Sequence, residues 1–387
     1  MTLSLLAVNQ PSGMWANLIN WVHSWVGGGY GWTILVLIIL LKLVLSPLDF
    51  LIKYSSKKTA LVQQKIAPQM AKLQKKYGDN RQMIQTQQQA LYKREGFSVW
   101  GSCVVMLVNL VLTMVIFFTL FSGLRQLSSY QAINQYNELR ETYTTTVHAE
   151  CANYDELMAE YVADTDHSDD GDYYNSLTSA LEVAQTAVQE KWTEVADNWL
   201  WVKNIWVNDG HASPLPSFKD LKSMASNSKI EEYVAYVKEI EDDTTKVKLV
   251  EYNLVAGMVE AKTGSWNGYY LLAVISVLLS IASQAVNDLS NKNKNKQAQA
   301  IVNQANPQGK SMWFMKLLVP VMMAIFVFTT NSAFGIYVVT NSIMSTLIGF
   351  LTNWIIGLAF KKKQEEVNEA LEKEAEKIQR KAIRRAK

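Results

Sequence analysis

One lysine stands in the middle of a long apolar stretch. Residues 32–52 read WTILVLIILLKLVLSPLDFLI, and Lys42 is their only formal charge before Asp49. The stretch is long enough to cross a bilayer as a helix, and a lysine at the centre of such a helix costs about 2.5–3.5 kcal/mol on insertion scales. No acid within a span is available to pair with Lys42, since Asp49 lies two helical turns away. The unpaired cation therefore indicates water around it, in a hydrated cavity between spans, in preference to a side chain that snorkels.

Other polar side chains in the apolar stretches could line the same cavity. They are Asn109, Thr113, Ser283, Gln284, Thr340 and Asn341. Each one alone is most simply explained as a packing or hydrogen-bonding residue between helices. Together with Lys42 they are the polar side chains that a hydrated cavity between the spans would expose.

Residue patterns of catalysis and metal binding are absent from the sequence. It contains no HExxH, no GxSxG, no P-loop and no Cys/His cluster with zinc spacing. Residues 164–172, DTDHSDDGD, are similar to a calcium loop, but Asn175 stands where the closing Glu is required, so a solvated acidic loop is favoured. We expect His23 to be an interfacial polar residue, and Cys103 and Cys151 to remain unpaired. The sequence therefore predicts a protein that is not an enzyme, without catalytic residues, metal or cofactor.

Five apolar blocks must position these residues. They predict transmembrane helices over residues 32–52, 99–124, 266–286, 312–329 and 333–360. The predicted fold class is an all-α polytopic membrane protein with a five-helix transmembrane core.

The segments outside the spans have distinct characters. We predict an N-terminal tail with an interfacial amphipathic helix (1–31), a helical hairpin (53–98), an acidic helical domain (125–265), a short loop (287–311) and a basic tail (361–387). The Trp-dense stretch NWLWVKNIWVNDG, residues 198–210, lies in the acidic domain. It fits either an element at the membrane interface or part of a packed core.

Charge is strongly segregated among these segments. Residues 53–98 contain ten Lys/Arg and two acids, residues 287–311 four and one, and residues 361–387 ten and six. Residues 125–265 instead contain eleven Lys/Arg and twenty-five acids. Cytoplasmic loops are enriched in Lys and Arg, so five spans place the three basic segments in the cytoplasm, and the N-terminus and the acidic domain outside.

The order of features along the chain resembles the YidC/Oxa/Alb membrane protein insertases. LKLVLSPL (41–48) looks like the family's first core span, in which a basic residue, usually arginine, lies five positions before a proline, as Lys42 lies before Pro47. The other similar stretches are the cytoplasmic loop 66–97, Gly-Ser-Cys at 101–103, the Trp-dense stretch 198–210 and the helical hairpin 312–345.

The resemblance implies a groove open to the cytoplasm and the lipid and closed externally, in which Lys42 attracts acidic groups of a substrate. It implies that the hairpin receives nascent membrane proteins, with Lys72, Lys75, Lys76, Tyr77, Tyr92 and Lys93 as candidate contacts. The tail would contact the ribosome through Arg380, Lys381, Arg384 and Arg385, although such a cluster also suits anionic lipid. We expect an insertase and chaperone of the bacterial plasma membrane, with the Sec translocon as a candidate partner and an unknown partner for the acidic domain.

The chain departs from the family's pattern at several positions. Lysine replaces arginine at Lys42, which keeps the charge and loses the planar fork of donors. The second span lacks the usual prolines, only Asn109 stands near the family's Gln-type residue, and the insertion over residues 125–265 has no obvious counterpart. Two other classes of function remain open: a small-anion channel or carrier with Lys42 as its site, and a scaffold whose acidic domain binds an external partner.

Overall fold

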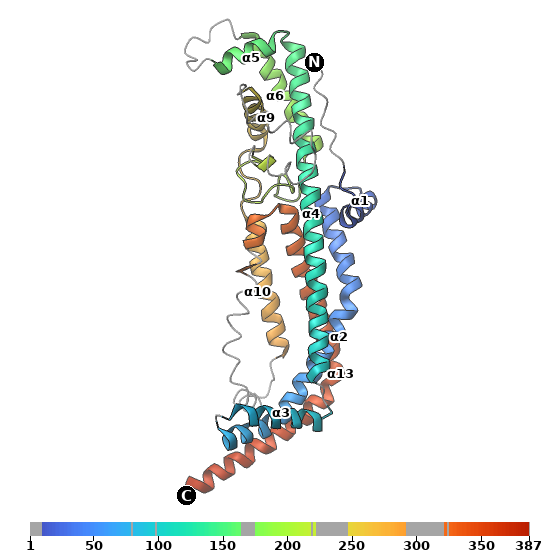
Figure 1. Ribbon diagram of the computed structural model, residues 1–387, viewed down its shortest axis with the longest axis vertical. Helices are drawn as coiled ribbons and strands as arrows, with labels where there is room; N and C mark the ends of the chain where they lie inside the picture. Colours follow the sequence, from blue (N-terminus) through green and yellow to red (C-terminus); the bar gives the residue numbers. More distant parts are fainter. Residues whose placement is uncertain are drawn as a thin grey trace. The chain divides into compact units, whose positions relative to one another are not determined.

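The computed structural model describes residues 10–78, 80–96, 99–163, 175–217, 220–221, 247–291, 321–322 and 325–386, with a few helical side chains left out. Regular structure in these residues is helical, without a strand (Figure 1). The helices are α1 (Met14–Val26), α2 (Tyr30–Tyr77), α3 (Arg81–Arg94), α4 (Val99–Glu150), α5 (Tyr154–Ala163), α6 (Asn175–Val195), α9 (Val247–Thr263), α10 (Leu271–Asn291) and α13 (Ser332–Ala386). The predicted fold class, an all-α polytopic membrane protein, is confirmed.

Three helices of the described chain are long and apolar enough to cross a membrane. They are α2, α4 from Leu110 onward, and α13 as far as Lys377. Each is one continuous helix that extends from an apolar stretch into a polar one, and α2 contains both Pro47 and Pro68. The third predicted span corresponds to α10, whose apolar part is shorter. Within the fourth, only residues 321–322 and 325–329 are described, and these are helical.

The chain divides into two compact units. The acidic unit comprises Met1–Ile38, Phe118–Ser276 and Ala324–Val339, and the hairpin unit comprises Ile39–Phe117, Val277–Met323 and Thr340–Lys387. The long helices contribute residues to both units, so each unit is described by itself.

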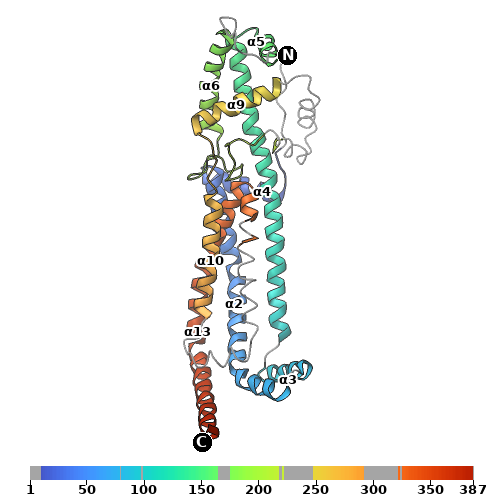
Figure 2. The ribbon, with the colours of Figure 1, turned by 90° about the vertical axis from the view of Figure 1, so that its left-hand side faces the viewer.

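A helical core organises the acidic unit. The end of α4 packs with α5, α6 and α9, which gather around it in Figure 2. Helix α6 contributes Ala180, Ala184 and Val188, which share one face because they lie four residues apart. Within this core the hydroxyls of Tyr143 and Tyr154 lie 2.7 Å apart and satisfy each other's hydrogen bonding.

The Trp-dense stretch belongs to the interior of the same unit. Trp206 is fully buried and Trp199 is 6% exposed, so the packed-core interpretation holds for both. The Trp206 indole N–H donates to the carboxylate of Asp197, which removes the cost of a buried unpaired donor.

Helix α1 packs on the protein through its apolar face. Trp15, Ile19 and Val22 are buried, and Trp15 lies against Gly123 of α4, where an added Cβ would come within 2.5 Å of the Trp15 Cβ. A side chain at position 123 would therefore displace α1. Gly27 ends the helix with φ +63°, a conformation that glycine adopts without strain.

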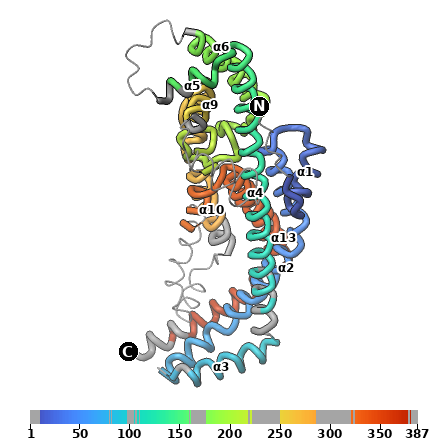
Figure 3. Tube along the Cα trace, turned by 45° about the horizontal axis from the view of Figure 1, so that its top comes forward, coloured from blue at the N-terminus to red at the C-terminus, as the bar shows by residue number. Residues whose placement is uncertain are grey.

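The hairpin unit is built on the polar parts of α2, α3 and α13, which run side by side in Figure 3. Helices α2 and α3 share a cluster of Ile66, Met70 and Tyr92. The Asn80 side chain caps α3 by accepting the Met83 N–H at 3.1 Å. A second cluster packs α13 on α2, through Leu61, Ile356 and Phe360.

Candidate functional site

Lys42 is half-buried on α2, in the hairpin unit. Its neighbours Leu43 and Val44 are exposed, as suits side chains that meet lipid. In the described part of the chain Lys42 makes no hydrogen bond or ion pair. A buried ammonium needs a partner or water to offset its desolvation, so the structure leaves this cation available to a ligand or to solvent.

The other predicted groove residues come from three further helices of the hairpin unit. Thr113 on α4 is exposed, Ser283 and Gln284 on α10 and Asn341 on α13 are half-buried, and Thr340 on α13 is buried. The Asn109 side chain lies outside the described residues. Among the side chains that are described, no direct hydrogen bond joins Lys42 to any of these residues. The structure thus brings four of the long helices into one unit without linking their polar groups directly.

An apolar surface accompanies these polar positions. Helix α4 exposes large apolar side chains along several turns. They are Val104, Leu107, Val108, Leu110, Val111, Leu112, Met114, Val115 and Phe118. On α13, Phe350 and Trp354 are similarly exposed. Such faces are compatible with lipid or with another apolar helix.

The candidate hairpin residues separate into buried and exposed groups. Tyr92 belongs to the α2–α3 cluster and is 8% exposed, so most of its ring holds the hairpin together. Lys75, Lys76 and Lys93 are exposed, and the Lys76 ammonium lies 5.2 Å from the ring centroid of Tyr77, which is half-buried. The three exposed lysines can therefore meet a partner without disturbing the fold.

Lys72 connects the hairpin to the tail. Its Nζ lies 2.6 Å from Oε1 of Glu374 on α13. Ten residues earlier on α13, Gln364 accepts a hydrogen bond from Lys57 at 3.1 Å and donates one to Gln64 at 2.7 Å. These contacts and the Leu61–Ile356–Phe360 cluster fix the first part of the tail against α2.

The last turns of the tail carry the predicted basic cluster. Arg380 is exposed and lies 3.8 Å from Glu376 on its own helix. The side chains of Lys381, Arg384 and Arg385 lie outside the described residues, although their backbone belongs to α13.

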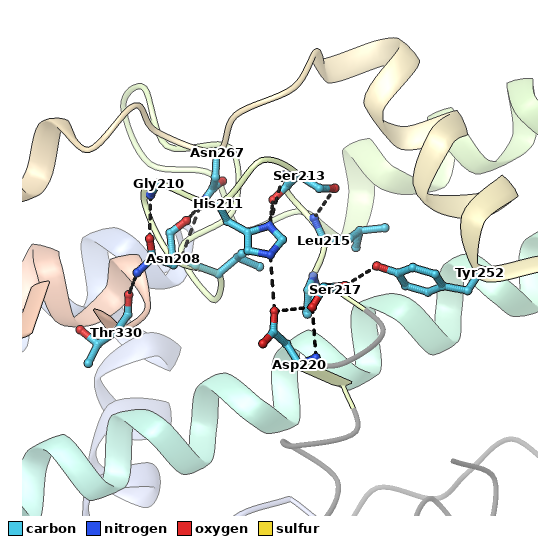
Figure 4. Close-up of polar contacts among 12 residues, drawn as sticks. Asn208, Gly210, His211, Ser213, Leu215, Ser217, Asp220, Tyr252, Asn267 and Thr330 are labelled. Atoms are coloured by element: carbon cyan, nitrogen blue, oxygen red, sulfur yellow. Dashed lines mark hydrogen bonds and ion pairs between the residues drawn. The ribbon is translucent and has the colours of Figure 1, made fainter. Parts of the chain in front are cut away.

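A buried polar layer in the acidic unit was not predicted from the sequence. Asn267 accepts the Asn204 N–H at 2.8 Å and donates to the Asn204 carbonyl at 2.7 Å. Its amide also donates to the Asn208 carbonyl, and Ser332 at the start of α13 donates to the Val207 carbonyl at 2.7 Å. Figure 4 shows Asn208 reaching Thr330, whose carbonyl it bonds at 2.7 Å. The layer joins the Trp-dense stretch to the ends of α10 and α13.

Asp209 completes this layer. Its Oδ2 accepts the Leu272 N–H at 2.8 Å, which satisfies a free donor of the first turn of α10. Its Oδ1 is buried beside Gly268 without a hydrogen-bond partner among the described residues. Burial raises the pKa of Asp209 to about 6, against the lowering effect of the Leu272 and Ala273 amides.

One signal could have located this layer. Asn204, Asn208 and Asp209 stand among tryptophans in the Trp-dense stretch, where short polar side chains commonly bond nearby backbone. Their distant partners, Asn267 and Ser332, carry no such signal in a single sequence.

The remaining predicted features are structural or undescribed. The His23 Nδ1 lies 2.9 Å from the Thr33 hydroxyl, and its ring stacks on Tyr30, so His23 is satisfied by packing. Cys151 is a buried free thiol, while the Cys103 side chain and the acidic loop 164–172 lie outside the described residues. No cluster of metal-binding side chains occurs in the part of the chain that was described.

Comparison with known proteins identifies the family. The family model described as "60Kd inner membrane protein" matches residues 21–358. The chain is 37% identical over 118 residues to the "Membrane protein insertase YidC" of Stenotrophomonas maltophilia strain K279a, covering 30% of this chain and 19% of the relative. It is 31% identical over 120 residues to the protein of the same name from Xanthomonas campestris pv. campestris strain 8004, with the same coverage.

The chain thus spans less than a fifth of the length of these curated relatives. No solved structure matches it. The family match nevertheless extends over residues of both units, over the first four predicted spans and over the fifth as far as residue 358. The chain therefore belongs to the 60Kd inner membrane protein family, the YidC/Oxa/Alb family of membrane insertases.

Proposed function

We propose that this protein inserts nascent membrane proteins into the bacterial plasma membrane and assists their folding. The observation that carries the proposal is Lys42, a cation in the apolar part of α2 with no described partner, within the region that matches the family. Family membership supports insertion in general, and Lys42 supports a specific mechanism.

The first step of that mechanism is electrostatic. Lys42 and the polar side chains of α4, α10 and α13 line a hydrated groove, and Lys42 attracts acidic residues in the polar flank of a substrate. Water in the groove shortens the apolar barrier that the flank must cross. Thr113, Ser283, Gln284, Thr340 and Asn341 would provide hydrogen-bonding groups there, together with Asn109.

The second step is lateral transfer to lipid. The apolar segment of the substrate slides against the exposed aliphatic and Met side chains of α4, including Leu107, Val111 and Met114. Burial of an apolar helix in the bilayer supplies the driving force, at about 25 cal/mol per Å² of apolar surface. No covalent step and no nucleotide hydrolysis is required.

A mutation of Lys42 tests the mechanism. Lys42→Ala should slow insertion of a single-span substrate with an acidic flank by about tenfold, the factor that corresponds to 1.4 kcal/mol. Lys42→Arg should preserve insertion because it keeps the charge. The matched control is Lys53→Ala, which removes a cation later on the same helix. The measurement is protease protection of the flank in vesicles that contain the purified protein and no nucleotide.

Two outcomes would contradict the proposal. Normal insertion by Lys42→Ala, with a substrate whose flank is acidic, would exclude the role of the charge. Chloride or phosphate flux through the wild-type protein that Lys42→Ala abolishes, without any insertion activity, would instead favour the small-anion channel or carrier.

The proposed partners follow from the same arrangement. Nascent membrane proteins would meet the exposed lysines of the hairpin, and the ribosome would meet the basic end of α13. The Sec translocon is a further proposed partner, and the acidic domain would bind an unidentified external one. Ribosome contact requires the tail in the cytoplasm, which agrees with the charge distribution and puts the N-terminus outside.

A further inference from the structure

The acidic unit contains a cavity of about 490 Å³ that shares no residue with the predicted groove. Its walls come from α4, from the Trp-dense stretch with the loop that follows it, and from the turn before α13. They include Phe121, Arg125, Trp206, His211, Asp220 and Thr330. The volume lies within the range of small-molecule sites, about 300–1,000 Å³.

Arg125 is the distinctive group in the wall. It is exposed, and it has no hydrogen bond or ion pair with any described residue. Every other lysine or arginine side chain described in the acidic unit has a partner. Arg140 lies 3.7 Å from Glu251, and Lys191 lies 3.0 Å from Glu138. Lys203 donates to two backbone carbonyls, and Lys262 donates to the Gln189 carbonyl. A guanidinium left open on a cavity is suited to a phosphate, which accepts its paired N–H donors.

Three neutral polar side chains of the wall, Ser128, Asn208 and Thr330, are already bound to backbone. The Ser128 hydroxyl donates to the Trp206 carbonyl at 2.8 Å, and the Thr330 hydroxyl donates to the Phe326 carbonyl at 2.6 Å. The amide of Asn208 is used in the same way. A ligand would therefore be recognised mainly by the charged side chains.

The second charged position is Asp220. Its Oδ2 accepts the Ser217 hydroxyl at 2.6 Å and lies 3.4 Å from the His211 Nε2, as Figure 4 shows. The carboxylate is about half exposed, so it can still accept hydrogen bonds from a ligand. The cavity is thus lined by a cation from α4 and a carboxylate from the loop that follows the Trp-dense stretch, which suits a ligand that bears both charges.

The cavity lies where apolar helices give way to polar chain. Arg125 directly follows the second predicted span, residues 99–124, and Thr330 lies in the turn between the fourth and fifth. Phe121 and Trp206 add aromatic surface. Phospholipid headgroups occupy this depth in a bilayer, and aromatic and basic side chains gather there.

We propose that this cavity binds the headgroup of an amine-bearing phospholipid such as phosphatidylethanolamine. The phosphate lies on the Arg125 guanidinium, and the ammonium donates to the Asp220 carboxylate. The acyl chains leave past Phe121 towards the apolar part of α4. The site is independent of Lys42 and of the proposed insertion mechanism.

Lipid retention tests the site. The full-length protein is released from nanodiscs that contain equal amounts of phosphatidylethanolamine, phosphatidylcholine and phosphatidylglycerol, and bound lipid is counted by native mass spectrometry. The wild type should retain phosphatidylethanolamine. Arg125→Gln should reduce retention about tenfold through the lost charge-assisted bonds. Lys262→Gln removes a cation of the same unit away from the cavity and should leave retention unchanged.

A second variant tests the amine. Asp220→Asn should keep phospholipid bound but remove the preference for ethanolamine over choline, because the quaternary choline ammonium has no N–H to donate. Thermal unfolding confirms that each variant is folded.

Three results would overturn the proposal. The first is equal retention by the wild type and Arg125→Gln. The second is stabilisation of the wild type, and not of Arg125→Gln, by inorganic phosphate without lipid retention, which would assign the cavity to a soluble phosphate. The third is cross-linking from a photo-reactive side chain at position 129 to a translocated peptide rather than to lipid.

Discussion

The carboxylate of Asp209 is buried, so its negative charge is poorly solvated. One oxygen caps α10, and the other is buried beside Gly268 without a described donor. The folded protein therefore binds a proton at this residue more tightly than the unfolded chain does, and the pKa rises from 3.8 to about 6. A raised carboxyl pKa contributes stability at low pH, and this contribution is lost as the pH rises through about 6.

Asp209→Asn should remove this pH dependence, because an amide oxygen can still accept the Leu272 N–H and does not ionise. Above pH 6 we expect the variant to be more stable than the wild type by up to about 2 kcal/mol, with the difference disappearing near pH 4. Thermal unfolding at both pH values, followed by tryptophan fluorescence, measures the difference. Parallel pH profiles for the two proteins would contradict the assignment. Burial also raises the pKa of Asp197, but this residue is present in both proteins, so its effect on the pH profile cancels in the comparison.

At the scale of elements, apolar blocks located the helices, but polarity did not set where they end. The sequence changes character after residue 52, yet α2 continues to Tyr77, and α13 continues from the last span to Ala386. Good helix formers such as Lys, Gln and Ala occur in both continuations, and no glycine interrupts them. Pro68 lies within α2 without ending it. A proline removes one intrahelical hydrogen bond, and a long helix can retain the others.

The continuity of α13 yields a prediction for the tail. Its anchoring contacts on α2 are made by residues up to Glu374, whereas the basic cluster lies beyond them. Removing residues 377–387 should therefore abolish co-sedimentation with ribosomes and leave the hairpin unit as stable as before. Glu374→Ala is the matched control, since an exposed ion pair contributes only about 0–1 kcal/mol and the basic cluster remains. Unchanged co-sedimentation after truncation would exclude ribosome contact through this cluster.

At the scale of the whole molecule, the family and the membrane fold could be predicted, and the internal organisation of the acidic unit could not. The apolar blocks predicted the membrane fold, and the order of family-like stretches predicted the family. Trp206 and Asn204 illustrate the remainder, since the stretch that contains them fits a membrane interface as well as a core. Asn204 bonds Asn267 and Gln135, and the Trp206 carbonyl accepts the Ser128 hydroxyl, all across more than 60 residues. Contacts of such separation leave no local pattern in one sequence.

The acidic unit therefore contains two parts with different expected roles. The helical core of α5, α6 and α9 lies outside the predicted spans, whereas the polar layer around Asn267 directly bonds the ends of α10 and α13. If the protein is an insertase, the layer should matter for activity and the helical core should not. If it is a scaffold that presents the acidic domain to a partner, the reverse holds.

Two variants separate these alternatives. One variant replaces residues 140–190 and residues 222–257 by Gly-Ser linkers. The linker between residues 139 and 191 can be short, because the side chains on either side of it meet: the Lys191 Nζ lies 3.0 Å from the Glu138 Oε2. This variant should still insert a single-span substrate in vesicles. The second, Asn267→Ala, removes the partners of the Asn204 N–H and of the Asn204 carbonyl, at a cost of about 1–3 kcal/mol for each buried group. It should lose insertion. An excision variant that folds but fails to insert, beside an active Asn267→Ala, would favour the scaffold.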